Sequence, residues 1–170
     1  MLKVLITDEY RKLNREMHER KKGYGSNGKK LAPVVLGLIR KYKIRSILDY
    51  GSGKGSFKVA LKPQVDIPIY QYEPAFHIDE RMPCDLVVCR DVLEHIEPDC
   101  IDNVLEDIRE LTLRCFYASI STKPSADILA DGTNAHRLQR KPEWWKEKIE
   151  GHFKIIEMDT QSKVFNVEAI

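Results

Sequence analysis

The sequence lacks long hydrophobic runs and carries no large charge of either sign. Its longest apolar runs, such as residues 86–89, are far too short to cross a lipid bilayer, and its first residues do not show the charged-then-apolar pattern of a secretion signal. The formal net charge of +2 is too small to indicate a nucleic-acid-binding protein, although residues 11–30 and 137–148 are locally basic. We therefore expect a cytoplasmic protein without a membrane partner.

The sequence also lacks Cys-x-x-Cys pairs, internal repeats and long linkers. Three of its four cysteines lie in or beside apolar runs, so we expect free thiols in the core. A chain of 170 residues that is 42% apolar can build one sizeable core, and we expect a single domain over residues 1–170. Within it, residues 1–30 should form an N-terminal helix and a segment in which Tyr24, flanked by glycines, acts as a hinged lid or forms a plain turn.

Hydrophobic periodicity indicates strands that alternate with helices, followed by a hairpin. The expected helices cover residues 8–21, 31–39, 57–62, 101–111 and 142–150, with Asp99 as the N-cap of the fourth. The expected strands cover residues 46–50, 67–72, 85–89 and 115–120, and the hairpin strands cover residues 152–160 and 163–167 around a turn at 161–162. This order predicts an α/β fold with a mostly parallel sheet and an antiparallel C-terminal element.

Three glycines directly follow the first predicted strand, where an α/β sheet binds its ligand. Gly51, Gly53 and Gly55 allow a tight turn and leave no side chain between the backbone and a nucleotide-like molecule. The loop is not a Walker phosphate loop, because Lys54 is not followed by serine or threonine. It also differs from the Gly-x-Gly-x-x-Gly dinucleotide fingerprint, because Ser56 occupies the place of the last glycine.

A carboxylate closes the second predicted strand. Glu73 stands 22 residues after Gly51, at a place from which a carboxylate can accept hydrogen bonds from both hydroxyls of a ribose. A third strand followed by the letters LEHI completes the pattern. Together these features are far more specific than a glycine-rich turn alone.

The three segments resemble the motifs of class I S-adenosylmethionine (SAM)-dependent methyltransferases. ILDYGSGKGSF is similar to motif I, YQYEP to the acidic motif, and CDLVVCRDVLEHIEP to the post-strand motif. The resemblance covers about residues 31–170 and is nearest to the ubiquinone-biosynthesis O-methyltransferase type, whose GTH…P segment is similar to DGTNAHRLQRKPEWW; the chain also resembles compact bacteriophage-encoded methyltransferases. It implies a three-layer Rossmann-like sandwich, SAM as cofactor, and methyl transfer to an oxygen or nitrogen of a small-molecule or nucleotide-like acceptor.

Carried over by position, the resemblance implies contacts of the glycine loop with the methionine part of SAM, a ribose contact from Glu73, and an Asp49 that orients the loop. Arg90 and Asp91 would line the methionine or adenine end. The implied cofactor-binding set comprises Asp49, Gly51, Ser52, Gly53, Glu73, Arg90 and Asp91. One departure concerns the sheet: only ten residues separate Glu73 from Cys84, where the family fits a helix and an edge strand. We therefore expect one edge strand to be missing.

Methyl transfer from a sulfonium needs alignment and a group that accepts a proton. The candidate catalytic residues are His95 after the third strand, His136 in the loop after the next strand, and Glu94. Either histidine could be the base; alternatively, His95 caps a turn and His136 is an exposed loop residue. A tryptophan pair, Trp144 and Trp145, is expected to supply one aromatic wall of the substrate site and one core anchor.

Other interpretations remain open. Spacing would place Asp91, Glu94 and His95 on one helical face, and with His136 they could bind a divalent metal, although our main interpretation assigns none. The alternative functions are an RNA or DNA methyltransferase, with metal-assisted 2′-O-methylation as one form, and a SAM-binding module without catalysis. The identity of the acceptor and the oligomeric state are left open.

Overall fold

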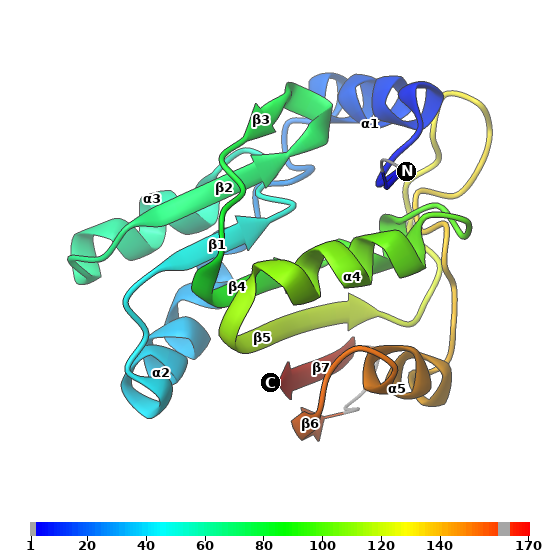
Figure 1. Cartoon of the computed structure of the whole chain (residues 1–170). Helices are drawn as coiled ribbons and strands as arrows, with labels where there is room; N and C mark the ends of the chain where they lie inside the picture. Colours follow the sequence, from blue (N-terminus) through cyan, green and yellow to red (C-terminus); the bar gives the residue numbers. More distant parts are fainter. Residues whose placement is uncertain (1–2, 160–163) are drawn as a thin grey trace.

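A seven-stranded mixed sheet forms the centre of the molecule in the computed structural model, which describes residues 3–159 and 164–170. The strand order is β3-β2-β1-β4-β5-β7-β6 (Figure 1). Strands β2, β1, β4 and β5 pair in parallel, whereas β3 and the β7–β6 hairpin pair antiparallel at the two edges. The strands are β1 (Ile47–Tyr50), β2 (Ile69–Glu73), β3 (Ile78–Asp79), β4 (Cys84–Arg90), β5 (Thr112–Ser121), β6 (Ile155–Asp159) and β7 (Val164–Ala169).

Five α-helices lie around this sheet in the part of the chain that the structure describes. They are α1 (Asp8–Arg20), α2 (Ala32–Tyr42), α3 (Ser56–Leu61), α4 (Ile101–Leu111) and α5 (Pro142–Glu150), and the short 3-10 helices are η1 (Gly28–Leu31), η2 (Lys62–Gln64), η3 (Pro74–Phe76) and η4 (Leu93–His95). Buried residues of α2 and α3 pack on one face of the sheet, and those of α4 and α5 pack on the other. Helix α1 instead lies across the end at which β1 and β2 finish (Figure 1).

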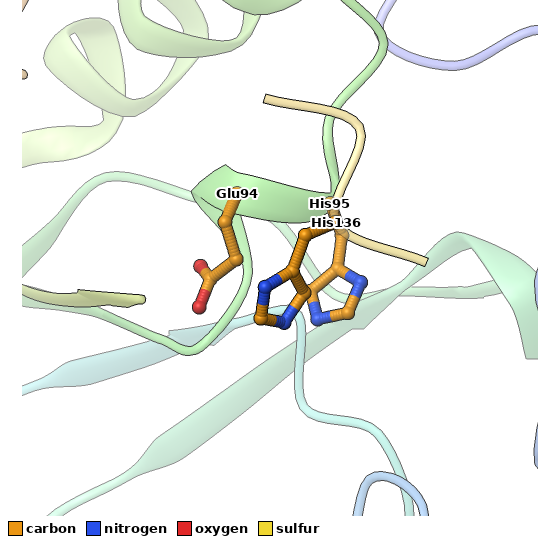
Figure 2. A group of neighbouring side chains, drawn as sticks. All are labelled: Glu94, His95 and His136. Atoms are coloured by element: carbon orange, nitrogen blue, oxygen red, sulfur yellow. The ribbon is translucent and has the colours of Figure 1, made fainter. Parts of the chain in front are cut away.

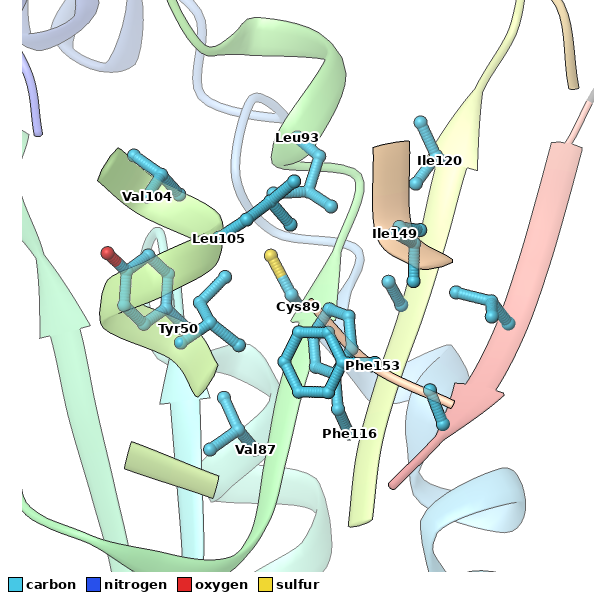
Figure 3. Packing of buried hydrophobic residues seen from close by; sticks show 14 of the residues in the cluster. Tyr50, Val87, Cys89, Leu93, Val104, Leu105, Phe116, Ile120, Ile149 and Phe153 are labelled. Carbon is cyan, nitrogen blue, oxygen red and sulfur yellow. The ribbon is translucent and has the colours of Figure 1, made fainter. Parts of the chain in front are cut away.

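Side chains along the central strands point alternately to the two faces of the sheet, which explains why each face carries its own apolar cluster. In β4, Val87 and Cys89 point into the cluster beneath α4 and α5 (Figure 3), while Leu86 and Val88 belong to the cluster beneath α2 and α3. Both faces are apolar because helices cover both, as expected for parallel strands. All four cysteines are free and buried, which confirms the prediction of core thiols.

The predicted helices and the C-terminal hairpin are confirmed in type and place. The predicted turn of the hairpin, at residues 161–162, lies outside the described residues. One capping prediction is wrong: the N-cap of α4 is Cys100 rather than Asp99, and it makes no side-chain capping bond. No helix within residues 3–159 and 164–170 is long and apolar enough to span a membrane.

The edge strand that we expected to be missing is present in a reduced form. After Glu73 the chain makes the single turn η3 and then β3, a two-residue strand that pairs antiparallel with β2. Arg81 fastens this edge, because its guanidinium bonds Asp79 at 2.7 Å and Asp107 at 3.0 Å and stacks 4.3 Å from the ring centre of Tyr72. A charged clamp thus holds a strand that is too short to be held by its own ladder.

Candidate active site

A cavity of about 420 Å³ opens at the end of the sheet where the parallel strands finish. In sheets of this kind ligands bind outside the carboxyl ends of the strands. The wall is formed by the loop after β1, the ends of β2 and β4, helix α1 with the segment that follows it, and the loop after β5. Nine of the ten predicted site residues line it: Asp49, Gly51, Ser52, Gly53, Glu73, Arg90, Asp91, His95 and His136.

Two positions of the glycine loop cannot carry a side chain in this arrangement. Gly51 has φ +81°, and a Cβ atom there would lie 2.3 Å from a methyl carbon of Val92. Gly53 has φ +53°, and its Cβ would lie 2.6 Å from the carbonyl oxygen of Gly25. The loop is also tied to the next strand, since the N–H groups of Gly51 and Ser52 both donate to the carbonyl of Tyr72. The glycines therefore serve close backbone packing as well as an open cavity wall.

Glu73 is buried at the end of β2, with its carboxylate facing the loop. Its Oε2 accepts the N–H of Gly53 at 2.8 Å, and its Oε1 accepts the N–H of Ala75 at 3.0 Å. Burial raises the pKa of Glu73, while the two N–H bonds oppose that shift. Each carboxylate oxygen can accept a second hydrogen bond. The geometry therefore leaves room for a pair of hydroxyl donors.

Three buried polar atoms on the cavity wall have no hydrogen-bond partner among the described residues: Nδ1 of His18 and, at the start of the glycine loop, the pair formed by Oδ2 of Asp49 and Oγ of Ser52. Burial, and secondarily the charge of Glu73, raises the pKa of Asp49 to about 7. Buried polar atoms are nearly always satisfied in folded proteins, so an unpaired pair in a cavity suits a polar or cationic ligand. Oδ2 of Asp49 therefore makes no hydrogen bond to the loop within the described part of the chain, and the role of Asp49 in orienting the loop stays a prediction.

Arg90 and Asp91 join three parts of the wall. Asp91 has φ +52°, its N–H donates to the carbonyl of Ser119 at 2.7 Å, and its carboxylate accepts the Ser119 hydroxyl at 3.2 Å. Arg90 donates from Nε to Asp91 at 3.3 Å and from Nη1 to the carbonyl of Asn27 at 2.9 Å. Arg90 therefore ties the end of β4 to the N-terminal region through its bond to Asn27.

Residues 21–28, which we term the cover segment, lie directly against the glycine loop. The N–H of Lys54 donates to the carbonyl of Gly25 at 3.0 Å, and its ammonium donates to the carbonyls of Lys21 and Lys22 at 3.1 and 2.9 Å. The hydroxyl of Tyr24 reaches the Nδ1 atom of His95, 3.2 Å away. The cover segment thus links α1, the loop and the end of β4 into one wall.

His95 and His136 come together from segments 41 positions apart, and their ring centres are 4.7 Å apart (Figure 2). Nδ1 of His95 lies 2.8 Å from the carbonyl of Ala135, and Nδ1 of His136 lies 2.5 Å from that of Lys123. A carbonyl only accepts, so each Nδ1 carries the ring proton and each Nε2 is left as a bare acceptor. Burial lowers the pKa of His95 to about 4.

Glu94, the tenth predicted site residue, is fully buried and does not line the cavity. Its Oε1 accepts the N–H of Ser121 at 2.7 Å, its Oε2 has no partner among the described residues, and burial raises its pKa to about 8. Glu94 therefore lies behind the cavity wall, and its catalytic role stays a prediction. The shared helical face for Asp91, Glu94 and His95 is wrong, because Asp91 is left-handed and the 3-10 turn η4 starts only at Leu93.

Residues 11–164 match the sequence profile of a family described as "Methyltransferase domain". The chain belongs to this family. Its fold is shared by the *Burkholderia thailandensis* 1,6-didemethyltoxoflavin N1-methyltransferase, solved with 1,6-didemethyltoxoflavin and S-adenosylhomocysteine (TM-score 0.68, 14% identity, 99% of this chain and 92% of that one). It is also shared by DhpI, solved with S-adenosylhomocysteine (TM-score 0.64, 14% identity, covering 94% of this chain and 95% of that one). A third similar structure is the PH0226 protein of Pyrococcus horikoshii (TM-score 0.63, 12% identity, covering 91% of this chain and 97% of that one). No curated protein sequence matches the chain.

Family and fold make the protein a SAM-dependent methyltransferase, as the three motifs predicted. SAM carries a ribose, an ammonium and a sulfonium, and the residues of the cavity fit these groups. Glu73 has acceptor positions free for the ribose hydroxyls, and the unpaired Oδ2 of Asp49 faces a place suited to a cation.

The cavity wall of this methyltransferase also contains a histidine that the sequence analysis did not single out. His18 of α1 is buried against the rings of Tyr24 and Phe76 and lines the cavity, and burial lowers its pKa to about 4. A signal was present, since Tyr10, Met17 and His18 recur at the spacing of one helical face and all three are buried. Trp145 is a fully buried core anchor, as expected for one of the two tryptophans, whereas Trp144 lies outside this cavity and borders a separate hollow with Arg140 and Glu147.

Proposed function

We propose that this methyltransferase moves the methyl group of SAM to an oxygen or nitrogen atom of a small-molecule or nucleotide-like acceptor. One observation carries the proposal. A single cavity contains both the groups that fit SAM and the two histidines whose Nε2 atoms have no partner among the described residues. The cofactor and the groups that would activate the acceptor thus share one cavity.

The cofactor would be held by residues of three strand ends. Glu73 would take the ribose hydroxyls, Asp49 and Ser52 would meet the charged and polar groups of the methionine part, and the backbone of Gly51 and Gly53 would pass close to the ligand. Arg90 and Asp91 would border the same space at the end of β4. The sulfonium supplies an activated methyl group, so the protein's own task is alignment and proton removal.

His95 or His136 would receive the acceptor's proton. Both rings are pinned through Nδ1 to a backbone carbonyl, which fixes the tautomer and presents Nε2 as the base. Loss of the acceptor's proton to Nε2 would free an electron pair for the bond to the methyl carbon that SAM supplies. The electrons of the carbon–sulfur bond would stay on sulfur in S-adenosylhomocysteine.

The size of the cavity favours a small acceptor. Its volume of about 420 Å³ lies toward the lower end of the range for ligand pockets, about 300–1,000 Å³, and SAM must share it. Only a compact group can therefore enter beside the cofactor. The structurally similar *Burkholderia* enzyme, whose solved complex contains 1,6-didemethyltoxoflavin with S-adenosylhomocysteine, supports the idea that this fold accommodates a small acceptor in that way.

Calorimetric titration with SAM and S-adenosylhomocysteine tests the first half of the proposal, and a screen with methyl-labelled SAM over hydroxyl- and amine-bearing metabolites and oligonucleotides tests the second. We expect both cofactor forms to bind and label to appear in small molecules. A His136→Gln variant should bind S-adenosylhomocysteine like the wild type but turn over more slowly. Failure of both cofactor forms to bind would overturn the proposal, and label confined to oligonucleotides would replace its acceptor with nucleic acid.

A further inference from the structure

Glu94, His95 and His136 each offer one ligand atom, and these atoms all lie within 4.8 Å of one another. The three side chains lie beside each other at the junction of η4 and the loop after β5 (Figure 2). We infer that this cluster is a binding site for a divalent transition metal of the zinc type, set in the wall of the acceptor cavity. The inference rests on the proposed function, because the ion would act on the acceptor bound in that cavity.

The buried carboxylate is the first argument. Oε1 of Glu94 is occupied by the N–H of Ser121, but Oε2 is completely enclosed and has no hydrogen-bond partner in the described part of the chain. Leaving a buried polar atom unpaired costs about 1–3 kcal/mol, and more for a charged group. A cation bound between Glu94 and the histidines would satisfy this atom.

The tethering of the imidazoles is the second argument. In metal sites a ligating histidine usually donates its other ring N–H to a carbonyl or carboxylate, which fixes the ring and increases its basicity. His95 and His136 both do so in this structure, through the carbonyls of Ala135 and Lys123. The two neighbouring rings therefore each have an Nε2 lone pair available to bind a metal ion.

The donor set then limits the choice of ion. Two imidazoles and one carboxylate match catalytic zinc sites, which keep a further position for water or substrate, whereas Mg²⁺ and Ca²⁺ prefer oxygen ligands alone. Tetrahedral coordination at about 2.1 Å places ligand atoms about 3.4 Å apart. The longest separation in the cluster must therefore shorten by up to about 1.4 Å, which small rotations of the three side chains would have to supply.

Such an ion changes how the acceptor is activated. Because both imidazoles line the cavity while Glu94 lies behind it, the open coordination positions would face the acceptor. An acceptor oxygen there would be polarised by the ion and lose its proton to water, and the imidazoles would hold the metal instead of taking that proton.

The test loads the full chain with Zn²⁺ or Co²⁺, removes free ion by dialysis, and measures bound metal by mass spectrometry and the visible spectrum of bound Co²⁺. We expect one equivalent of Zn²⁺ and the absorption of a four- or five-coordinate Co²⁺ site. His136→Gln and Glu94→Gln should each weaken metal binding by at least about tenfold. The matched control His152→Gln, which changes a histidine outside the cavity, should bind like the wild type.

Glu94→Gln keeps an oxygen for the N–H of Ser121, so its fold is checked by its melting curve and by titration with S-adenosylhomocysteine. Substoichiometric metal in the wild type, or metal binding that both cluster variants retain in full, would overturn the inference. Titration with S-adenosylhomocysteine in metal-free buffer separates the two proposals. If that ligand binds and the ions do not, only the metal site fails; if the ions bind and neither SAM nor S-adenosylhomocysteine does, the proposed function fails.

Discussion

The pH dependence of SAM binding should be governed largely by Asp49. This carboxyl group is buried on the cavity wall with Oδ2 unpaired, and burial raises its pKa to about 7. A cationic ligand binds the ionised form, which makes up about 10% of the protein at pH 6 and about 90% at pH 8. The affinity for SAM should therefore increase about tenfold between these pH values, a change of about 1.4 kcal/mol.

Replacing Asp49 by asparagine isolates this contribution. Asp49→Asn keeps the shape of the side chain but cannot ionise. Relative to wild type, its free energy of SAM binding should therefore be less favourable by about 1.5–3 kcal/mol at pH 8 and by much less at pH 6. The ammonium group of SAM itself titrates near pH 8, but it does so equally with both proteins and cancels in the comparison. The assay is calorimetric titration of wild type and variant from pH 6 to pH 8.

The matched control is Asp66→Asn, which neutralises an exposed aspartate and should leave the pH dependence of wild type unchanged. The reasoning is refuted if Asp49→Asn and wild type show parallel affinity curves over the whole range. That result would mean that the Asp49 carboxyl stays protonated in the complex or does not meet the cation.

Three further changes test other parts of the structure. Gly53→Ala should abolish measurable SAM binding, because its Cβ would lie 2.6 Å from a carbonyl oxygen of the cover segment; Gly132→Ala, also at positive φ but with nothing within 4 Å, should bind normally in the same titration. Trp145→Ala should lower the free energy of unfolding by about 3–5 kcal/mol in urea melts and Trp144→Ala by less than about 1 kcal/mol, since only Trp145 is fully enclosed; equal losses would contradict this. Arg81→Ala should lower the free energy of unfolding by about 1–2 kcal/mol in the same urea melts, because the guanidinium joins two carboxylates and one aromatic ring. An unchanged melt would rule out the clamp.

Much of the layered architecture could be predicted, because it depends on short-range patterns. Apolar spacing located α2 and α4, and the glycines and Glu73 marked two strand ends that the parallel sheet brings to one edge. The two-residue strand β3 could not be found in this way, since two residues have no period. Its stability comes from Arg81, whose partner Asp107 is distant in sequence.

The details of the histidine cluster required the structure. Treating residues 91–95 as a helix wrongly placed Asp91 with Glu94, because nothing local showed that Asp91 would adopt φ +52°. A 3-10 turn then carries Glu94 inward and His95 toward the cavity. His136 reaches them through a loop whose course depends on bonds such as that to the Lys123 carbonyl, which no periodicity records.

The contact between Gly25 and Gly53 has a consequence for how such chains can diverge. A side chain on Gly53 would strike the carbonyl of Gly25, and one on Gly25 would lie 2.4 Å from the ring of His18. Gly53 therefore cannot accept a larger residue unless the cover segment moves away, and Gly25 cannot do so unless the His18 ring moves, since a Cβ on Gly25 would also lie 3.3 Å from Cα of Gly53. In a family of related sequences the two sites should change together, and the N-terminal region should be inherited with the cofactor loop as a single unit rather than exchanged as a separate appendage.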